Sequence, residues 1–350
     1  MKRHLATINA LVRPPFAVLL GLFAAVGMAQ AGAFPSLLRQ LLALGAISGW
    51  MLWAVALNDV ADEDVDRVNL VADLRRVLVH RTASRRELVG IAAISATVAL
   101  ACAAAISLPV AGVVGGGLLL AAAYSLPPFR LSGRGALTAA LLPLGYVTVP
   151  FLVGAWSVRT GLDAHGAALL AALYLGFMGR LVLKDFRDVV GDRLYGKRTL
   201  LVRHGRRRTC AFSASFWAAG WLLAIVVERQ SPVLVTALSA FALGTLWLLR
   251  RIAGDEHGAR DTVTISTIAV LGRAFLCTLV LDLSMALDHR GAWLRAAVLA
   301  VSTVAWLSTA RDHHRRFAPS VDVLGDDELA AMPPPVTVHG ADRAPVTAVA

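Results

Sequence analysis

The chain alternates between long apolar stretches and short polar connections that are mostly basic. Each stretch has about the length of a helix that crosses a bilayer, which needs roughly 20 predominantly apolar residues. Ten stretches occur, of which the fourth and tenth are the least sharply defined: 13–32, 36–58, 87–107, 109–126, 136–156, 166–184, 210–228, 232–250, 262–286 and 292–310. The pattern predicts an all-α, polytopic transmembrane helix bundle of nine to ten spans.

Composition agrees with a membrane protein. The chain is 57% hydrophobic and 16% charged, and its mean hydropathy is +0.66, which excludes an ordinary soluble domain. The N-terminus lacks the ordered features of a cleavable leader, so we expect the first stretch to be a retained span. Beyond about 317 the chain is rich in Pro, Ala, Asp and Val without periodicity. We therefore expect a transmembrane domain over 1–317 and a disordered cytoplasmic tail over 318–350.

The net charge of +11 reflects membrane topology rather than a nucleic-acid partner. When successive connections are assigned to alternate sides, one side holds most of the 34 Lys and Arg residues. The connections on the other side hold only Arg39, Arg159, Arg229, Arg290 and Arg295. The positive-inside rule then predicts that both termini are cytoplasmic. The Ala- and Arg-rich composition suits a bacterial inner membrane.

Two acidic motifs close the second and sixth stretches. Each has three aspartates at i, i+3 and i+7, and the first also has a leading asparagine: Asn58, Asp59, Asp62 and Asp66, then Asp185, Asp188 and Asp192. On a helix, this spacing places the three carboxylates on one face. Such close carboxylates resist ionising together unless cations neutralise them, and oxygen ligands favour Mg²⁺. We predict that the six aspartates hold Mg²⁺ against a diphosphate.

The repeated setting of the motifs argues against ordinary solvated helix ends. In both places two spans lead to an acidic motif and then to a basic connection, which suggests two halves related by duplication. Glu63 is replaced by Val189 in the second copy and Asp64 points away from the shared face. We expect both acidic residues to be solvated or paired with the following connection.

Basic residues near the motifs are candidates for binding a diphosphate, because the planar guanidinium of arginine matches phosphate geometry. Those near the same membrane boundary are Arg67, Arg76, Arg130, Lys184, Arg187, Arg193, Lys197 and Arg198. Arg130 and Lys197 rank first because each follows a short turn motif near the end of a span. Two further arginines lie inside spans: we expect Arg180 to extend toward the interface, and Arg273 to face a cavity or a partner such as Asp282.

Four segments, in order, resemble the UbiA superfamily of intramembrane prenyltransferases. They are Arg13-Pro14, the first acidic motif, the segment 124–131 (YSLPPFRL), and the second acidic motif with its continuation 196–200 (GKRTL). Three positions depart from the family pattern: Val77 follows Arg76 where a proline is usual, Ser132 replaces a lysine, and the segment 200–202 lacks a proline.

The resemblance implies a bundle around a central cavity with a cytoplasmic cap, both acidic motifs facing the cavity. It implies Mg²⁺-dependent transfer of a prenyl group from an isoprenyl diphosphate to a lipophilic or aromatic acceptor, through an allylic carbocation. The metal ligands would be Asp59, Asp62, Asp66, Asp185, Asp188 and Asp192, with Asn58 completing the catalytic set. The substrate-binding residues would be Arg13, Arg76, Tyr124, Arg130, Lys184 and Lys197.

Two other functions remain open at the level of sequence. Some proteins similar to this family cyclise the isoprenoid without an acceptor, as membrane terpene cyclases. A non-catalytic ion or phosphate transporter is the other alternative, although carboxylates would then be expected at the membrane midplane. Ordinary apolar residues specify neither the acceptor nor the prenyl chain length. Arg273 is a candidate for the acceptor site.

Overall fold

The computed structural model describes residues 2–69, 75–229, 231–255 and 261–316, and all regular structure within these ranges is helical. The α-helices are α1 (Lys2–Leu11), α2 (Pro14–Gln30), α3 (Leu37–Ala61), α4 (Glu63–Asn69), α5 (Arg85–Ile106), α6 (Leu108–Ser125), α7 (Ala136–Pro143), α8 (Val149–Val158), α9 (Ala164–Leu181), α10 (Asp185–Leu194), α11 (Leu200–Val227), α12 (Pro232–Gly254), α13 (Asp261–Leu287) and α14 (Ala292–Arg316). Short helical turns are η1 (Leu131–Gly133), η2 (Leu144–Thr148) and η3 (Val182–Lys184). The tail expected over 318–350 lies outside the described residues.

The structure confirms a multi-pass membrane protein. Within the described ranges, nine helical segments are long and apolar enough to cross a membrane, and α2 is shorter at 17 residues. Arg13, at the start of α2, contacts Asp59 near the end of α3. The chain therefore runs away from that end along α2 and returns along the longer α3. All ten apolar stretches form helices, including the tenth.

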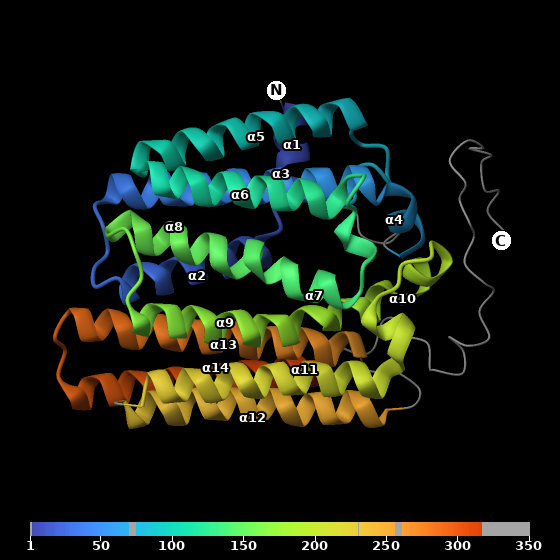
Figure 1. Cartoon of the computed structure of the whole chain (residues 1–350). Coiled ribbons are helices and arrows are strands. Elements are labelled where there is room, and N and C mark those ends of the chain that lie inside the picture. Colours follow the sequence, from blue (N-terminus) through green and yellow to red (C-terminus); the bar gives the residue numbers. More distant parts are fainter. Residues whose placement is uncertain (1, 70–74, 230, 256–260, 317–350) are drawn as a thin grey trace.

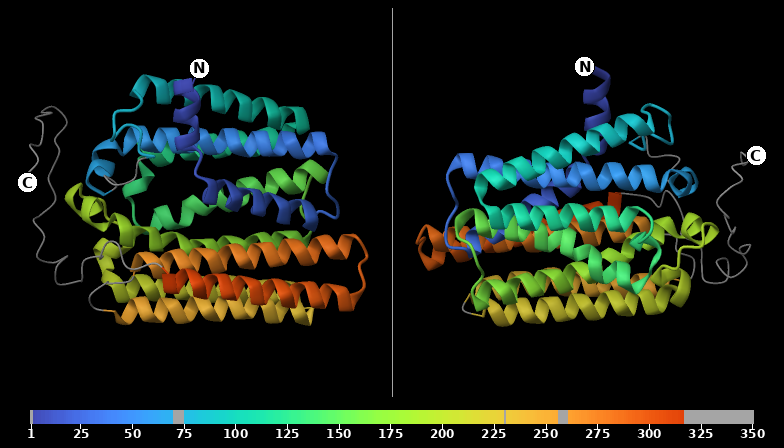
Figure 2. Two further views of the ribbon diagram at one scale, coloured as in Figure 1. Left: turned by 180° about the vertical axis from the view of Figure 1, so that it is seen from behind. Right: turned by 45° about the horizontal axis from the view of Figure 1, so that its top comes forward.

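The helices form two groups that meet on α2 and α8 (Figure 1). The first group contains α3, α5 and α6, and the second contains α9, α11, α12, α13 and α14. Figure 2 shows α2 between α3 and α13, in agreement with the contacts of α2 to both helices. Buried residues of α2 and α8 contribute to the hydrophobic cores of both groups. The two central helices therefore join the halves of the bundle.

Glycines allow the central helices to cross at close range. A Cβ on Gly27 of α2 would lie 2.1 Å from the carbonyl oxygen of Phe151, and one on Gly154 of α8 would lie 2.1 Å from that of Ala24. Small residues at helix crossings let backbones approach closely inside a membrane, where packing rather than water drives association. Substituting either glycine would force α2 and α8 apart.

The pairing of helices is repeated in the two halves, as expected for a duplication. α3 packs on α5 after the first long connection, and α9 packs on α11 in the second half. Both contacts use a glycine beneath a serine carbonyl: a Cβ on Gly49 would lie 2.6 Å from Ser95 O, and one on Gly179 would lie 2.5 Å from Ser213 O. The helices that carry the acidic motifs are thus fixed in the same manner.

Candidate active site

Both acidic motifs lie at the same end of the bundle, where α4 and α10 form a cap (Figure 1). The three aspartates of the second motif lie on one helix, α10, as predicted. The first motif is not on a continuous helix, because Asp62 ends α3 with φ −105° and ψ 16°. Helical hydrogen bonding continues across the break, since Asp62 N donates to Asn58 O and Asp66 N donates to Asp62 O. All three aspartates remain buried.

Two arginines hold the first aspartate of the first motif. Oδ1 of Asp59 lies 2.8 Å from Arg13 Nη2 and 2.5 Å from Arg76 Nη1. Arg76 Nη1 also lies 2.8 Å from Oδ2 of Asp66. Arg76 and both aspartates are buried, so this network links the end of α3, the cap and the start of α2. The sequence predicted that these arginines and aspartates belong to the site, but it did not predict which carboxylate each arginine contacts.

Lys197 bridges the two motifs. Its Nζ lies 3.2 Å from Asp62 Oδ1 and 3.6 Å from Asp192 Oδ1. Asn58 Nδ2 donates to the other oxygen of Asp62 at 3.0 Å. Arg130 reaches Asp62 Oδ1 from the outside at 3.5 Å, and its side chain is 51% exposed. Asp62 is therefore the point at which the two halves of the site meet.

The second motif has different partners. Arg187 Nε donates to Asp188 Oδ1 at 3.0 Å. Lys184 Nζ donates to the Tyr124 hydroxyl at 2.9 Å, which connects the start of α10 to the end of α6. Both Lys184 and Tyr124 were predicted substrate-binding residues, and the structure brings them into direct contact.

Charges at the cap follow their surroundings. Burial raises the pKa of Asp66 to about 7, with the negative charges of Asp59, Asp62 and Asp188 adding to the effect and Arg76 opposing it. Burial lowers the pKa of Lys197, but Asp62 and Asp192 outweigh it and hold that pKa above its usual value. Ionising the whole set of carboxylates therefore requires additional positive charge.

Glu63 behaves as predicted and belongs to the surface of the cap. It accepts hydrogen bonds from Arg67 Nη2 and Arg85 Nε, each at 2.6 Å. Burial raises its pKa, but these two arginines outweigh that effect and hold the pKa below its usual value. Asp64 is exposed. Neither residue lines the cavity described next.

A cavity of about 680 Å³ opens between the two groups of helices below the cap. Eleven of the predicted site residues line it: Arg13, Asn58, Asp62, Asp66, Arg76, Tyr124, Lys184, Asp185, Asp188, Asp192 and Lys197. Asp59 lies behind Arg13 and Arg76, and Arg130 contacts Asp62 from outside the lining. The site therefore consists of residues that line the cavity and of two residues, Asp59 and Arg130, that contact this lining from outside it.

The donor set fits Mg²⁺ in its chemistry. Every acidic residue in the described lining belongs to one of the two motifs and supplies only oxygen ligands, which Mg²⁺ prefers. Oδ2 of Asp59 is buried without a hydrogen-bond partner in the part of the chain that the structure describes. In those same residues no three His, Cys, Asp or Glu side chains are gathered tightly enough to enclose a metal. Lys197 instead supplies the positive charge between the motifs.

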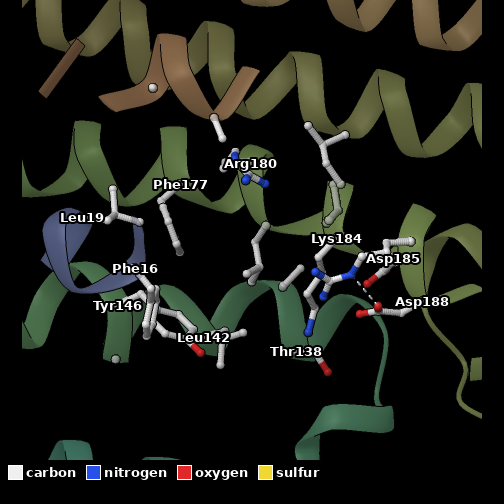
Figure 3. A pocket seen from close by; sticks show the side chains of 18 of the residues that line it. Phe16, Leu19, Thr138, Leu142, Tyr146, Phe177, Arg180, Lys184, Asp185 and Asp188 are labelled. Atoms are coloured by element: carbon white, nitrogen blue, oxygen red, sulfur yellow. Dashed lines mark hydrogen bonds and ion pairs between the residues drawn. The ribbon is translucent and has the colours of Figure 1, made fainter. Parts of the chain in front are cut away.

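Aromatic residues form the wall of the cavity away from the cap, and sequence reasoning did not identify them. Phe16 and Tyr146 pack edge to face with ring centroids 4.8 Å apart, and Phe177 lies 5.8 Å from Tyr146. Figure 3 shows Asp185 and Asp188 on one side of the pocket and these rings on the other. Tyr146 lies on the π-helical turn η2, directly after Pro143. Pro143, just before this turn, is a residue in the sequence that could have indicated an irregular helix at this place.

The structure corrects two expectations about arginines inside spans. Arg180 was expected to extend toward the interface but lines the cavity. Asp282, the suggested partner of Arg273, instead pairs with Arg295 at 2.8 Å. Arg273 lines the same cavity as Arg180, as expected of an intramembrane charge that faces an interior.

These features define a class of protein: an intramembrane helical bundle whose cavity carries two facing aspartate motifs and basic residues at one end. The model of the UbiA prenyltransferase family matches residues 18–269. The chain belongs to this family.

Individual relatives agree with the assignment. The chain is 36% identical over 229 residues to digeranylgeranylglyceryl phosphate synthase from Archaeoglobus fulgidus, covering 62% of this chain and 72% of the relative. It is 31% identical over 134 residues to the synthase of that name from Methanothermobacter thermautotrophicus, covering 35% of this chain. That match spans 46% of the relative, about half its length.

The fold matches a solved structure. A UbiA homologue from Archaeoglobus fulgidus bound to GPP and Mg²⁺ superposes with a TM-score of 0.61 at 20% sequence identity. The superposition covers 79% of this chain and 99% of the homologue. At this identity the comparison establishes the helical fold, which was predicted from the sequence.

Proposed function

We propose that the chain catalyses Mg²⁺-dependent transfer of a prenyl group from an isoprenyl diphosphate to a lipophilic or aromatic acceptor inside the membrane. One observation carries the proposal: Lys197 joins Asp62 and Asp192, so the two acidic motifs meet at one end of a single intramembrane cavity. A diphosphate with its metal ions would require this arrangement of carboxylates and cations. The homologue bound to GPP and Mg²⁺ supports the same chemistry.

The residues at the cap are suited to holding a diphosphate. Asp62, Asp66, Asp185, Asp188 and Asp192 would hold Mg²⁺, which supplies positive charge to the departing diphosphate oxygens. Asp59 belongs to the same proposed set and keeps Arg13 and Arg76 in place.

Basic and polar side chains act alongside the carboxylates. Arg13, Arg76, Lys184 and Lys197 line the cavity and would donate to the diphosphate. Arg130 would reach it past Asp62. Asn58 and Tyr124 position Asp62 and Lys184 through their hydrogen bonds. Donors fixed before the reaction favour the charge that develops as the allylic C–O bond breaks.

The aromatic wall would accept the isoprenoid and exclude water. Phe16, Tyr146 and Phe177 face the cavity away from the cap. The allylic cation formed when diphosphate leaves would be quenched by water in an open site. Electron-rich rings beside the prenyl carbons would stabilise the positive charge. The nucleophilic carbon of the acceptor would then form the new C–C bond, and the proton that this carbon loses would pass to the released diphosphate.

The test measures diphosphate release and prenyl products with GPP and longer isoprenyl diphosphates. The purified protein is assayed with and without Mg²⁺, and against an Asp62→Ala/Asp188→Ala double variant. An Asp64→Ala variant serves as a matched control, because Asp64 is an exposed carboxylate of the same cap. We expect release that requires Mg²⁺, survives in the control and is lost in the double variant.

The products separate the alternatives. Adducts that form only with an acceptor support transfer, whereas a cyclic hydrocarbon or alcohol formed without acceptor indicates a terpene cyclase. Absence of release from a folded protein across chain lengths refutes both and returns attention to a non-catalytic transporter. The position of the carboxylates at one end of the cavity argues against a transporter, and the names of the relatives, which are prenyl-transferring synthases, favour transfer over cyclisation.

We further propose a bacterial inner membrane as the location, with the cap and both termini cytoplasmic. The basic connections lie on the side of the cap. Arg13 contacts the first motif, and His313 near the end of α14 contacts Ser266 near the start of α13, so both described ends lie on one side. A reporter fused to residue 316 distinguishes the two orientations.

A further inference from the structure

Two arginines inside the membrane-spanning region face the cavity and belong to neither acidic motif. Arg273 lies near the middle of α13 (Asp261–Leu287), and Arg180 lies one residue before the end of α9. Both line the cavity. Both side chains therefore bring positive charge to the wall of one cavity. Figure 3 shows Arg180 apart from both Asp185 and the Phe16–Tyr146 pair.

Nothing in the described lining neutralises this pair. Each acidic residue of that lining belongs to an acidic motif at the cap, and the structure shows no carboxylate in ion-pair contact with Arg180 or Arg273 within the described ranges. Asp282, which the sequence suggested as a partner of Arg273, forms an ion pair with Arg295 at 2.8 Å. By contrast, the buried Arg206 near the start of α11 has a bidentate partner in Asp261 at 2.9 and 2.6 Å.

Two polar side chains, Ser266 and His313, line the same cavity as the two arginines and could contribute to a binding site. Ser266 Oγ and His313 Nε2 share a hydrogen bond at 2.7 Å, and both residues line the cavity. Ser266 lies seven residues before Arg273 on α13, about two turns away, which places both on one face of that helix. Arg273, Ser266 and His313 thus lie on one part of the wall, and Arg180 of α9 lines the same cavity.

Unpaired like charges inside a membrane bundle are costly, and such residues usually face a ligand or a partner. A packing role would be met more cheaply by apolar side chains of similar volume. The planar forks of two arginines in one cavity match the oxygens of a carboxylate or a phosphate. An oxyanion bound there would neutralise this charge.

We propose that Arg180 and Arg273 bind the anionic group of the prenyl acceptor, a carboxylate or a phosphate ester. The inference rests on the proposed prenyl transfer for the identity of the molecule that carries the anion. Arg180 precedes Lys184 by four residues, about 6 Å along a helix, so an anion held there places its attached group beside the diphosphate end. The acceptor then extends between the cap and the aromatic wall, where the prenyl carbon is released.

The test measures anion binding directly, so it does not depend on turnover. Purified protein without Mg²⁺ is titrated with benzoate, phenyl phosphate, inorganic phosphate and the neutral benzamide, and binding is followed by calorimetry and by the shift in Tm. The variants are Arg180→Gln, Arg273→Gln and the charge-conserving Arg180→Lys. Arg250→Gln is the matched control, because Arg250 is an exposed arginine on α12.

We expect at least one aromatic oxyanion to bind, and the amide to bind about tenfold or more weakly. Each Gln variant should lose about tenfold or more in anion affinity, Arg180→Lys should retain part of it, and Arg250→Gln should match the wild type. Preference for benzoate assigns a carboxylate acceptor, and preference for phenyl phosphate assigns a phosphate ester. The Lys variant separates loss of charge from failure to fold.

Two results would overturn the inference: no probe binds the wild-type protein, or the anions bind both Gln variants as tightly as the wild type. Equal binding of benzoate and benzamide would also overturn it, because the ring alone would then account for affinity. Diphosphate release from GPP is measured separately on the wild type. Its absence refutes the proposed transfer while the anion titrations still decide whether the two arginines form a site.

Discussion

Asp59 and Asp185 occupy the same place in the two acidic motifs, yet their surroundings differ. Asp59 is held by Arg13 and Arg76 at 2.8 and 2.5 Å. Among the described residues, no arginine forms an ion pair with Asp185, which lines the cavity directly. The leading aspartate of the first motif thus holds two arginines at the cap, whereas the leading aspartate of the second lines the cavity. Equal spacing in the sequence does not imply equal roles.

The largest expected effect is on turnover when the second motif is altered. In Asp185→Asn, we expect Mg²⁺-dependent release from GPP to fall by about 100-fold or more, because an amide cannot supply the negative charge that metal needs. The apparent Tm in detergent should stay the same or rise, since a buried amide is cheaper than a buried carboxylate. Release within about twofold of the wild type would remove Asp185 from the site.

Removing a partner of the first motif should lower the free energy of unfolding. Arg76→Gln leaves Asp59 and Asp66 buried with a lost partner, and we expect a cost of about 3–5 kcal/mol in the free energy of unfolding. Arg187→Gln is the matched control, because that side chain is 55% exposed and such pairs contribute about 0–1 kcal/mol. Denaturant titration in detergent measures both. Equal losses would mean that the two motifs are held alike.

Replacing Lys197, which contacts both motifs, should change ligand affinities by an intermediate amount. In Lys197→Gln, we expect Mg²⁺ alone to bind about tenfold more tightly, since a competing charge is gone, and GPP to bind about tenfold more weakly. Calorimetric titration with each ligand measures the two affinities. Arg130→Gln should change either affinity less, because its side chain is half exposed. If Lys197→Gln lowers the affinity for both Mg²⁺ and GPP, the lysine stabilises the fold of the site and does not compete with Mg²⁺ for the carboxylates.

The smallest effect belongs to the surface of the cap. Glu63→Gln removes a partner of Arg67 and Arg85, and we expect a cost below about 1 kcal/mol. Release from GPP should remain near that of the wild type, because Glu63 does not line the cavity. A loss of tenfold or more would show that the first motif extends to a fourth carboxylate and would contradict the distinction drawn between Glu63 and Asp62.

Hydropathy was enough to predict the ten helices, since a bilayer requires long apolar segments. The i, i+3, i+7 spacing was enough to predict that the second set of aspartates lies on one helix, but not that α3 breaks at Asp62 within the first. The partners of those aspartates were beyond the sequence. Arg76 and Lys197 lie in connections whose path is set by tertiary packing, and no local pattern states which carboxylate each will meet.

The error over Arg180 has a geometric cause. The sixth stretch was expected to end at the interface near residue 184, which would leave Arg180 within reach of water. The chain instead continues into η3 and α10, which form part of the cap, so Arg180 lies below it. The aromatic wall was missed for another reason. The π-helical turn after Pro143 alters the helical period at Tyr146, and a regular pattern cannot anticipate which way that ring points.

The contact of Lys197 with Asp62 and Asp192 has a consequence for how the protein is made. A nascent chain must enter the bilayer and assemble its helices whether or not divalent ions are at hand, and a cluster of bare carboxylates would resist that assembly. The tethered ammonium acts as a built-in counterion that accompanies the polypeptide from synthesis onward. Loading of the mature site is then an exchange of one cation for another, so the affinity measured for substrate includes the work of moving Lys197 aside.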